Sequence, residues 1–162
     1  MNATGITNSG LVTVGTGSVT IPNASVGAFT FTETNTIPQA TYSTLTLNNA
    51  LGTFTAAGAV TASTLTLTSG TFDIGGNTLT ATALTNNGTI QTSGNGSNLL
   101  LTPASVGNVH FINNATLLPA KTYATLTLDN GGTAQGDITA TTLDLNAGIL
   151  NIGANNLTVT TL

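Results

Sequence analysis

The chain has 162 residues, of which only one is Lys or Arg and five are Asp or Glu, so its formal net charge is −4. About a quarter of the residues in a typical globular chain are charged, so solubility here must depend on neutral polar groups. A single cationic side chain excludes ordinary nucleic-acid binding and attraction to anionic membranes. The absence of cysteine excludes disulfides and thiolate chemistry, and no apolar run is long enough to span a bilayer as a helix.

The chain contains two long segments of similar sequence, one in each half. Residues 24–27 (ASVG) return as residues 104–107, and the longer segment 61–84 returns as residues 139–162. Self-similarity at a nearly fixed period indicates a repeat architecture. We therefore expect two consecutive β-solenoid repeats, residues 1–81 and 82–162, continuous with each other.

Short strands separated by tight turns are predicted along each repeat. In the first repeat, residues 65–67, 72–74 and 79–81 place apolar side chains at alternate positions, the period of a strand with one buried face. Residues 68–70 and 75–77 between them contain Gly or Asn, which adopt turn conformations at low cost. The second repeat has the same order of strands and turns from residue 143 onward.

A shorter period lies inside the long one, because residues 43–47 (STLTL) recur as residues 63–67. This spacing is suitable for one coil of a β-solenoid. The nested periods predict an all-β fold, a β-solenoid (parallel β-helix) of about eight coils, with a pair of β-sandwiches as the alternative. At roughly 4.8 Å per coil the rod would be about 40 Å long. Stacked like charges would repel along such a rod, which explains their scarcity.

The ordered elements in residues 41–49, 60–80 and 84–90 resemble the β-strand repeat regions of secreted bacterial surface proteins, especially adhesin-like proteins with β-solenoid stalks. Tyr42 and Tyr123 hold the aromatic position that precedes a Leu-x-Leu strand in that family. The resemblance implies an extracellular or cell-surface location and a load-bearing or spacing role. Such stalks belong to much larger chains, so this sequence is either a fragment or reaches length by polymerising.

Both ends of the predicted solenoid are apolar, whereas terminal repeats normally have polar caps. Leu162 also has the same phase as Ile6, because both correspond to Leu84 in the long repeat. We expect head-to-tail assembly of identical copies, in which residues 157–162 contact the first coil of the next copy around residues 6–14. The candidate interface residues are Ile6, Leu11, Val12, Val14, Leu157, Val159 and Leu162.

His110 is the only histidine, and Thr30 holds its position in the first repeat. Without cysteine and with few carboxylates, it is not expected to form a metal site or a catalytic triad. We expect a solvated side chain on a strand whose neighbours Val109 and Phe111 point inward.

The remaining charged residues offer little chemistry. Asp129, Asp137 and Asp144 all lie in the second repeat and could line one flank, with calcium binding as an alternative, but no known calcium-loop pattern is present. Lys121 is expected to be solvated; an isopeptide bond to an Asn is the alternative, although Ala40 replaces this lysine in the first repeat. We therefore expect no enzymatic activity, no metal and no cofactor.

Alternating threonines predict outward-facing hydroxyls on several strands, as in residues 44–46 and 64–66. A flat threonine array on a solenoid is similar to the ice-binding face of antifreeze proteins. The favoured hypothesis is a structural subunit of an extracellular filament, stalk or matrix, with itself as partner and other cell-surface components as further candidates. The alternative is a monomeric binding module, either an adhesin segment or a threonine-array ice-binding protein.

Overall fold

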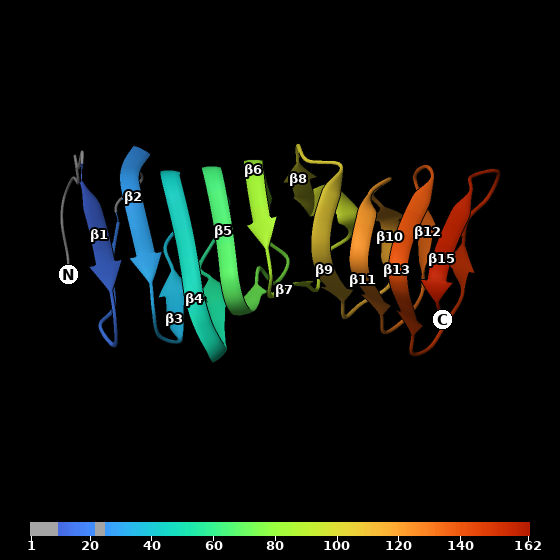
Figure 1. Cartoon of the computed structure of the whole chain (residues 1–162), viewed down its shortest axis with the longest axis horizontal. Coiled ribbons are helices and arrows are strands. Elements are labelled where there is room, and N and C mark those ends of the chain that lie inside the picture. The colour runs from blue at the N-terminus through green and yellow to red at the C-terminus, as the bar shows by residue number, and fades with distance from the viewer. Residues whose placement is uncertain (1–9, 22–24) are drawn as a thin grey trace.

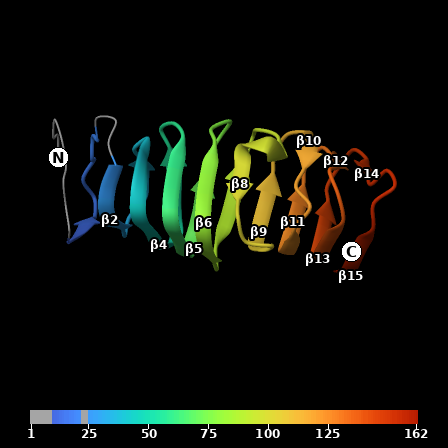
Figure 2. The ribbon, with the colours of Figure 1, turned by 90° about the horizontal axis from the view of Figure 1, so that it is seen from above.

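The computed structural model describes residues 10–21 and 25–162. Strands make up 64% of it and form parallel sheets arranged as a β-solenoid of about eight turns. Successive coils follow one another along the long axis, with β1 (Leu11–Val14) near one end and β15 (Leu157–Thr161) at the other (Figures 1 and 2). The predicted solenoid is confirmed.

The strands follow one another through both repeats, and a short 3-10 helix lies between β7 and β8. In chain order the remaining elements are β2 (Ser25–Phe31), β3 (Asn35–Ile37), β4 (Ala40–Ala56), β5 (Val60–Asp73), β6 (Leu79–Asn86), β7 (Thr89–Thr92), η1 (Gly96–Asn98), β8 (Leu99–Leu101), β9 (Ser105–Phe111), β10 (Ala115–Leu118), β11 (Thr122–Leu128), β12 (Gly132–Ala134), β13 (Ile138–Leu145) and β14 (Leu150–Asn151).

The shorter sequence period is the length of one coil. β4 and β5 pair in parallel with Leu45 opposite Leu65 and Thr46 opposite Thr66. Because side chains alternate across a strand, the leucines of this ladder point inward and the threonines outward. Leu45 and Leu65 are fully buried.

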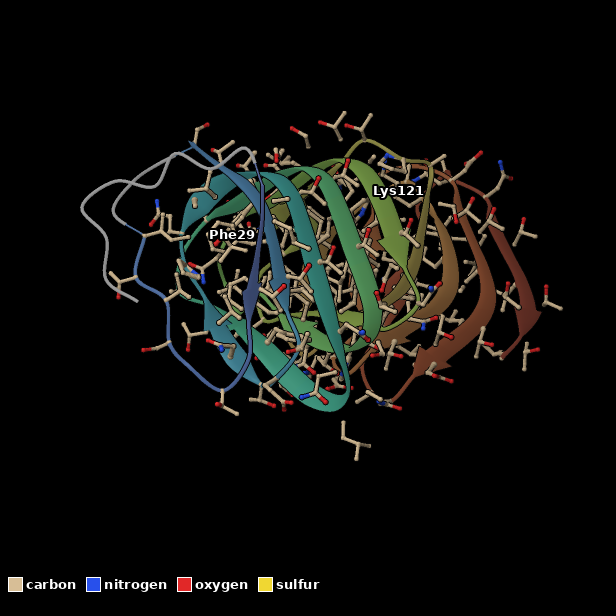
Figure 3. All side chains as sticks on the ribbon, turned by 60° about the vertical axis from the view of Figure 1, so that its left-hand side comes forward. Phe29 and Lys121 are labelled. Carbon is tan, nitrogen blue, oxygen red and sulfur yellow. The ribbon has the colours of Figure 1, made fainter. Side chains whose placement is uncertain are left out.

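The core is a continuous column of apolar side chains along the solenoid axis. Phe29 in β2 stacks on Leu45 in β4, which in turn stacks on Leu65 in β5. Figure 3 shows Phe29 among the side chains enclosed by the coils. Each fully buried side chain of this size contributes about 1.5–3 kcal/mol relative to an exposed one, so stability accumulates coil by coil.

The pairing of strands shifts at the point where the two repeats meet. β2 and β9 hold the same position in the sequence repeat, but β2 lies between β1 and β4, whereas β9 lies between β7 and β11. β6 pairs with β5 and β8, off the path that continues into the second repeat. The second repeat therefore begins stacked on β7 instead of on β6, which is one strand position further around the coil. β10, β12 and β14 form a separate three-stranded sheet.

Asparagine side chains join successive coils at the corners. Asn86 donates hydrogen bonds to the carbonyls of Val106 (2.9 Å) and Asn108 (3.0 Å), and Asn108 donates to the Gly88 carbonyl (2.9 Å). Gly88 lies in the turn after β6, and Val106 lies where the register between β9 and β11 shifts, so these carbonyls need side-chain partners. The abundance of Asn therefore has a structural cause.

One tyrosine in each repeat closes the same kind of local contact. The Tyr42 hydroxyl donates to the Pro38 carbonyl and the Tyr123 hydroxyl to the Pro119 carbonyl, both at 2.8 Å. Burial raises the pKa of both hydroxyls above the usual value, because the phenolate form would lose its hydration. The aromatic position noted in the sequence is a buried structural position.

Candidate self-assembly interface

The C-terminal coil leaves two strand edges open. Within residues 10–21 and 25–162, β15 pairs only with β13 and β14 pairs only with β12. Each strand therefore presents a row of backbone N–H and C=O groups along its outer edge. An open edge of this kind is a template for pairing with another strand.

Large apolar side chains gather at the same end. Ile149 is 80% exposed, Leu162 is 90% exposed and Leu145 is 39% exposed. Leu157 and Val159, two of the predicted interface residues, are half-buried against the core. The last coil therefore has an inner layer of packed residues and an outer layer without a cover among the described residues.

A hollow marks the point where the last coil stops. β15 covers β13 as far as the pair Thr142–Thr161. The residues that follow this pair on the two segments line an open space of about 440 Å³: Leu143, Asp144, Leu145, Asn146 and Leu162. Further chain stacked on this end would fill it.

The N-terminal candidates differ in exposure. Leu11 is 63% exposed, Val12 is half-buried against the core, and Val14 is 7% exposed because it already packs in its own coil. Ile6 lies outside the described residues. The structure thus places the described candidates at two opposite ends of the rod, Leu11 to Val14 at one and Leu157 to Leu162 at the other (Figure 1).

The expectation of a solvated His110 needs correction: the side chain lies on β9 between buried Val109 and Phe111 and is 26% exposed, but it is paired with a residue of the next coil. Its Nε2 atom is shielded from solvent and lies 3.0 Å from Asp129 Oδ2. Asp129 Oδ1 also accepts a hydrogen bond of 2.7 Å from Asn146 Nδ2. The Asn146 hydrogen bond first, and the His110 contact second, hold the pKa of Asp129 below its usual value. Sequence spacing could not reveal this pair, because it joins neighbouring coils.

The three aspartates of the second repeat do not converge. Asp137 accepts hydrogen bonds from the Asn156 backbone N–H (2.8 Å) and side chain (3.2 Å), and the backbone bond is the larger cause of its lowered pKa. Asp144 lies instead at the edge of the C-terminal hollow. Across the described part of the chain, no group of three or more His, Asp or Glu side chains could hold a metal ion.

The expectation of a solvated Lys121 is also wrong. Its Nζ donates to the main-chain carbonyls of Leu101 (2.7 Å) and Pro103 (2.9 Å), and the residue is half-buried. Figure 3 shows the labelled side chain at the rim of the coils. Both partners are backbone oxygens of the preceding coil, so this amine acts as a corner clamp like the asparagines.

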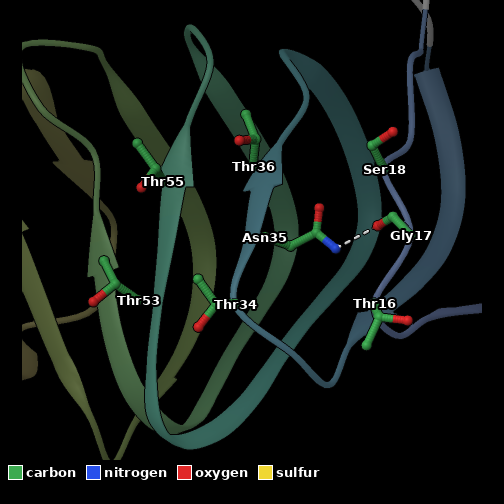
Figure 4. A pocket seen from close by; sticks show the side chains of 8 residues that line it. All are labelled: Thr16, Gly17, Ser18, Thr34, Asn35, Thr36, Thr53 and Thr55. Carbon is green, nitrogen blue, oxygen red and sulfur yellow. Dashed lines mark hydrogen bonds between the residues drawn. The ribbon is translucent and has the colours of Figure 1, made fainter.

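Outward threonines form columns in strand register. Thr30, Thr46, Thr66 and Thr85 lie opposite one another on β2, β4, β5 and β6. A second group surrounds a shallow, open hollow of about 310 Å³ near β3, where Asn35 Nδ2 also donates to the Gly17 carbonyl at 2.7 Å (Figure 4). The hollow is lined by Thr16, Gly17, Ser18, Thr34, Asn35, Thr36, Thr53 and Thr55. Neutral hydroxyls of this kind offer hydrogen bonds without charge.

None of the helices in the described segments has the length and apolar character needed to cross a membrane. A scan against protein-family models, a search of the curated proteins and a search of the solved structures each find no match for this chain.

Proposed function

We propose that this protein is a structural subunit of an extracellular bacterial filament, stalk or matrix, and that copies assemble head to tail through the ends of the solenoid. The observation that carries the proposal is the C-terminal coil, where the open edges of β14 and β15 coincide with exposed Ile149 and Leu162. Backbone hydrogen bonding and apolar burial would then act on the same surface.

Apolar burial and backbone pairing would both contribute to the free energy of assembly. Full burial of an exposed Leu or Ile contributes about 1.5–3 kcal/mol, and each new ladder hydrogen bond adds about 0.5–1.5 kcal/mol net. Association costs at least several kcal/mol in lost freedom. A shallow polar contact would not offset that cost, whereas a whole stacked coil supplies many contacts of both kinds.

The charge distribution supports stacking rather than opposing it. Asp144 is the one charged residue among those lining the hollow or forming β14 and β15. Neutral Thr and Asn side chains can stack about every 4.7–4.9 Å without the repulsion that ladders of like charge produce. Such a rod carries tension along its backbone ladders, which is suitable for a stalk or filament.

The extracellular assignment rests on composition and on the resemblance to surface-protein repeats. The absence of cysteine removes a site of oxidation. Other cell-surface components are further candidate partners of the proposed filament.

Negative-stain electron microscopy with light scattering tests the proposal. The purified chain is expected to form fibres with an axial repeat of about 40 Å, from about eight coils at roughly 4.8 Å each. A variant lacking residues 157–162 is expected to stay monomeric with an unchanged far-ultraviolet circular dichroism spectrum. A full-length chain that remains monomeric at high concentration would overturn the proposal.

A monomeric binding module is the second candidate, favoured by the registered columns of Thr30, Thr46, Thr66 and Thr85. This function predicts that replacing Thr46 and Thr66 by Val abolishes a ligand-dependent effect, such as retarded ice growth, without changing the oligomeric state. Fibres that form without any ligand would favour the structural role.

A further inference from the structure

The joint between the two repeats inside the chain has a counterpart at the N-terminal end. β7 pairs with β9 with Ile90 opposite Val109, and β1 pairs with β2 with Val12 opposite Phe29. β1 and β7 are separated by the same number of residues as the segments 61–84 and 139–162. β2 and β9 are separated by the same number of residues as the segments 24–27 and 104–107. β1 is therefore the equivalent of β7. In the internal joint, which is the pairing of β7 with β9, β7 is the strand on which the second repeat stacks.

The strand on the other edge of β7 indicates which strand could pair with the free edge of β1. Inside the chain, β7 also pairs with the second half of β5, with Phe72 opposite Ile90. The equivalent of Phe72 in the second repeat is Leu150 in β14, whose outer edge is open among the described strands. By this equivalence, the strand that would pair with the open edge of β14 is a copy of β1.

We infer that β1 of a second copy pairs with β14 in the register of the internal joint, with Val12 opposite Leu150 and Thr13 opposite Asn151. The inference rests on the proposed head-to-tail assembly and specifies how the ends meet. It defines a joint in which the next copy starts one strand position around the coil, as the second repeat does inside the chain.

A second pairing follows from the same joint. β6 pairs with β8 with Leu79 opposite Leu99 and Thr80 opposite Leu100. By the same two spacings, the equivalent of β6 is β15 and the equivalent of β8 is the segment 19–21. β15 therefore lies against residues 19–21 of the next copy, with Thr158 opposite Thr20. The simpler stacking expected from sequence placed residues 157–162 against residues 6–14.

Paired substitutions at the ends support this register independently. Inside the chain, Thr71 lies opposite Thr89. The two equivalent positions are Ile149, 80% exposed, and Leu11, 63% exposed. Where the internal joint has two threonines, the two ends of the chain thus have large apolar side chains. These are exposed in the single chain and would lie opposite each other in the joint. This complementarity identifies the occupant of the surface as a second copy of this chain.

The terminal hollow fits the same occupant. Leu67 is fully buried and lies opposite Asn86 in β6. Its equivalent, Leu145, is 39% exposed and lines the hollow. In the joint, the next copy would cover Leu145 as β6 covers Leu67.

Cysteine cross-linking tests the register, because the chain has no cysteine of its own. Four double variants combine Thr13→Cys or Thr20→Cys with Thr158→Cys or Asn151→Cys. The partners in each variant lie at opposite ends of the rod, so cross-links between them join different molecules (Figure 1). A short bifunctional methanethiosulfonate reagent is added to the assembled protein, and denaturing electrophoresis separates the products.

The inferred register predicts a ladder of covalent oligomers for Thr158→Cys with Thr20→Cys and for Asn151→Cys with Thr13→Cys. The exchanged combinations should give at most dimers, as should each single-cysteine control. Assembled protein that gives the reverse pattern, equal ladders in all four variants or no ladder would overturn the register while leaving head-to-tail assembly intact. Protein that does not assemble would overturn both.

Apolar variants give a second readout. Leu11→Asn and Ile149→Asn should each raise the concentration at which light scattering detects assembly, by about tenfold or more for roughly 1.5 kcal/mol of lost burial. Leu51→Asn is the matched control, because Leu51 is fully exposed on β4 and lies in neither joint strand. An equal effect of all three variants would contradict the inferred joint, as would no effect of Leu11→Asn or Ile149→Asn on assembling protein.

Discussion

The internal coil formed by β5 and β6 and the terminal coil formed by β13, β14 and β15 share one sequence pattern but differ in burial. Leu67 and Phe72 are fully buried, whereas their counterparts Leu145 and Leu150 are 39% exposed and half-buried. The difference has a simple cause: another coil covers the internal copy, and no described coil covers the terminal copy. The same sequence pattern is therefore core in one place and surface in the other.

The largest effect should come from truncating the paired leucines. Leu67→Ala is expected to lower the free energy of unfolding by about 2–5 kcal/mol, because it leaves a cavity in a closed core. Leu145→Ala should cost the monomer less than about 1 kcal/mol, since its side chain already meets solvent. Urea unfolding at a concentration below assembly measures both, and equal losses would contradict an open terminal coil.

The turn glycines provide an intermediate effect. Gly70 and its counterpart Gly148 have φ of 86° and 78°, and a Cβ added to either would clash with a backbone carbonyl oxygen, that of Asn49 or that of Asn130. Gly70→Ala should therefore cost more than about 1–2 kcal/mol. Gly148→Ala should cost less in the monomer, because the terminal coil can shift. Thermal unfolding measures both, with Gly76→Ala as a control, since nothing lies within 4 Å of its added Cβ.

The smallest effect concerns pH. Asp129 has a lowered pKa in the folded state, so its contribution to stability is present above the ordinary pKa of about 4 and is lost as pH falls through the lower folded value. Asn48 holds this position in the first repeat, where its Oδ1 accepts from Ser69 without a titrating group. Asp129→Asn should cost less than about 1 kcal/mol at pH 7.

Urea unfolding at pH 7 and at pH 2–3 measures this effect. The difference between Asp129→Asn and the unaltered chain should shrink at the lower pH, and Asn48→Ala should cost the same at both. A difference for Asp129→Asn that grows on acidification would show that the sign of this account is wrong.

Much of the fold could be predicted because it depends on local periodicity. The recurrence of residues 43–47 as residues 63–67 predicted the coil length, and the ladder from Leu45 to Leu65 confirms it. The shift of β9 onto β7 could not be predicted, since it depends on how a long strand such as β5 turns a corner and pairs with both β6 and β7.

The contacts of the polar side chains were harder to predict than the strands. His110 and Lys121 were expected to be solvated, yet each meets a group on a neighbouring coil. Such contacts depend on the register between coils at a corner, where turn lengths vary. The apolar character of residues 157–162 could be read from the sequence, because it is a property of composition.

Hydrogen–deuterium exchange compares the two regions most directly. At a concentration where the chain is monomeric, peptides covering residues 149–162 should exchange much faster than those covering residues 71–84. At a concentration where the chain assembles, the exchange of the terminal peptides should slow toward that of the internal ones. Terminal peptides that are equally protected at both concentrations, or that exchange rapidly at both, would contradict the account of an open coil that a second copy closes.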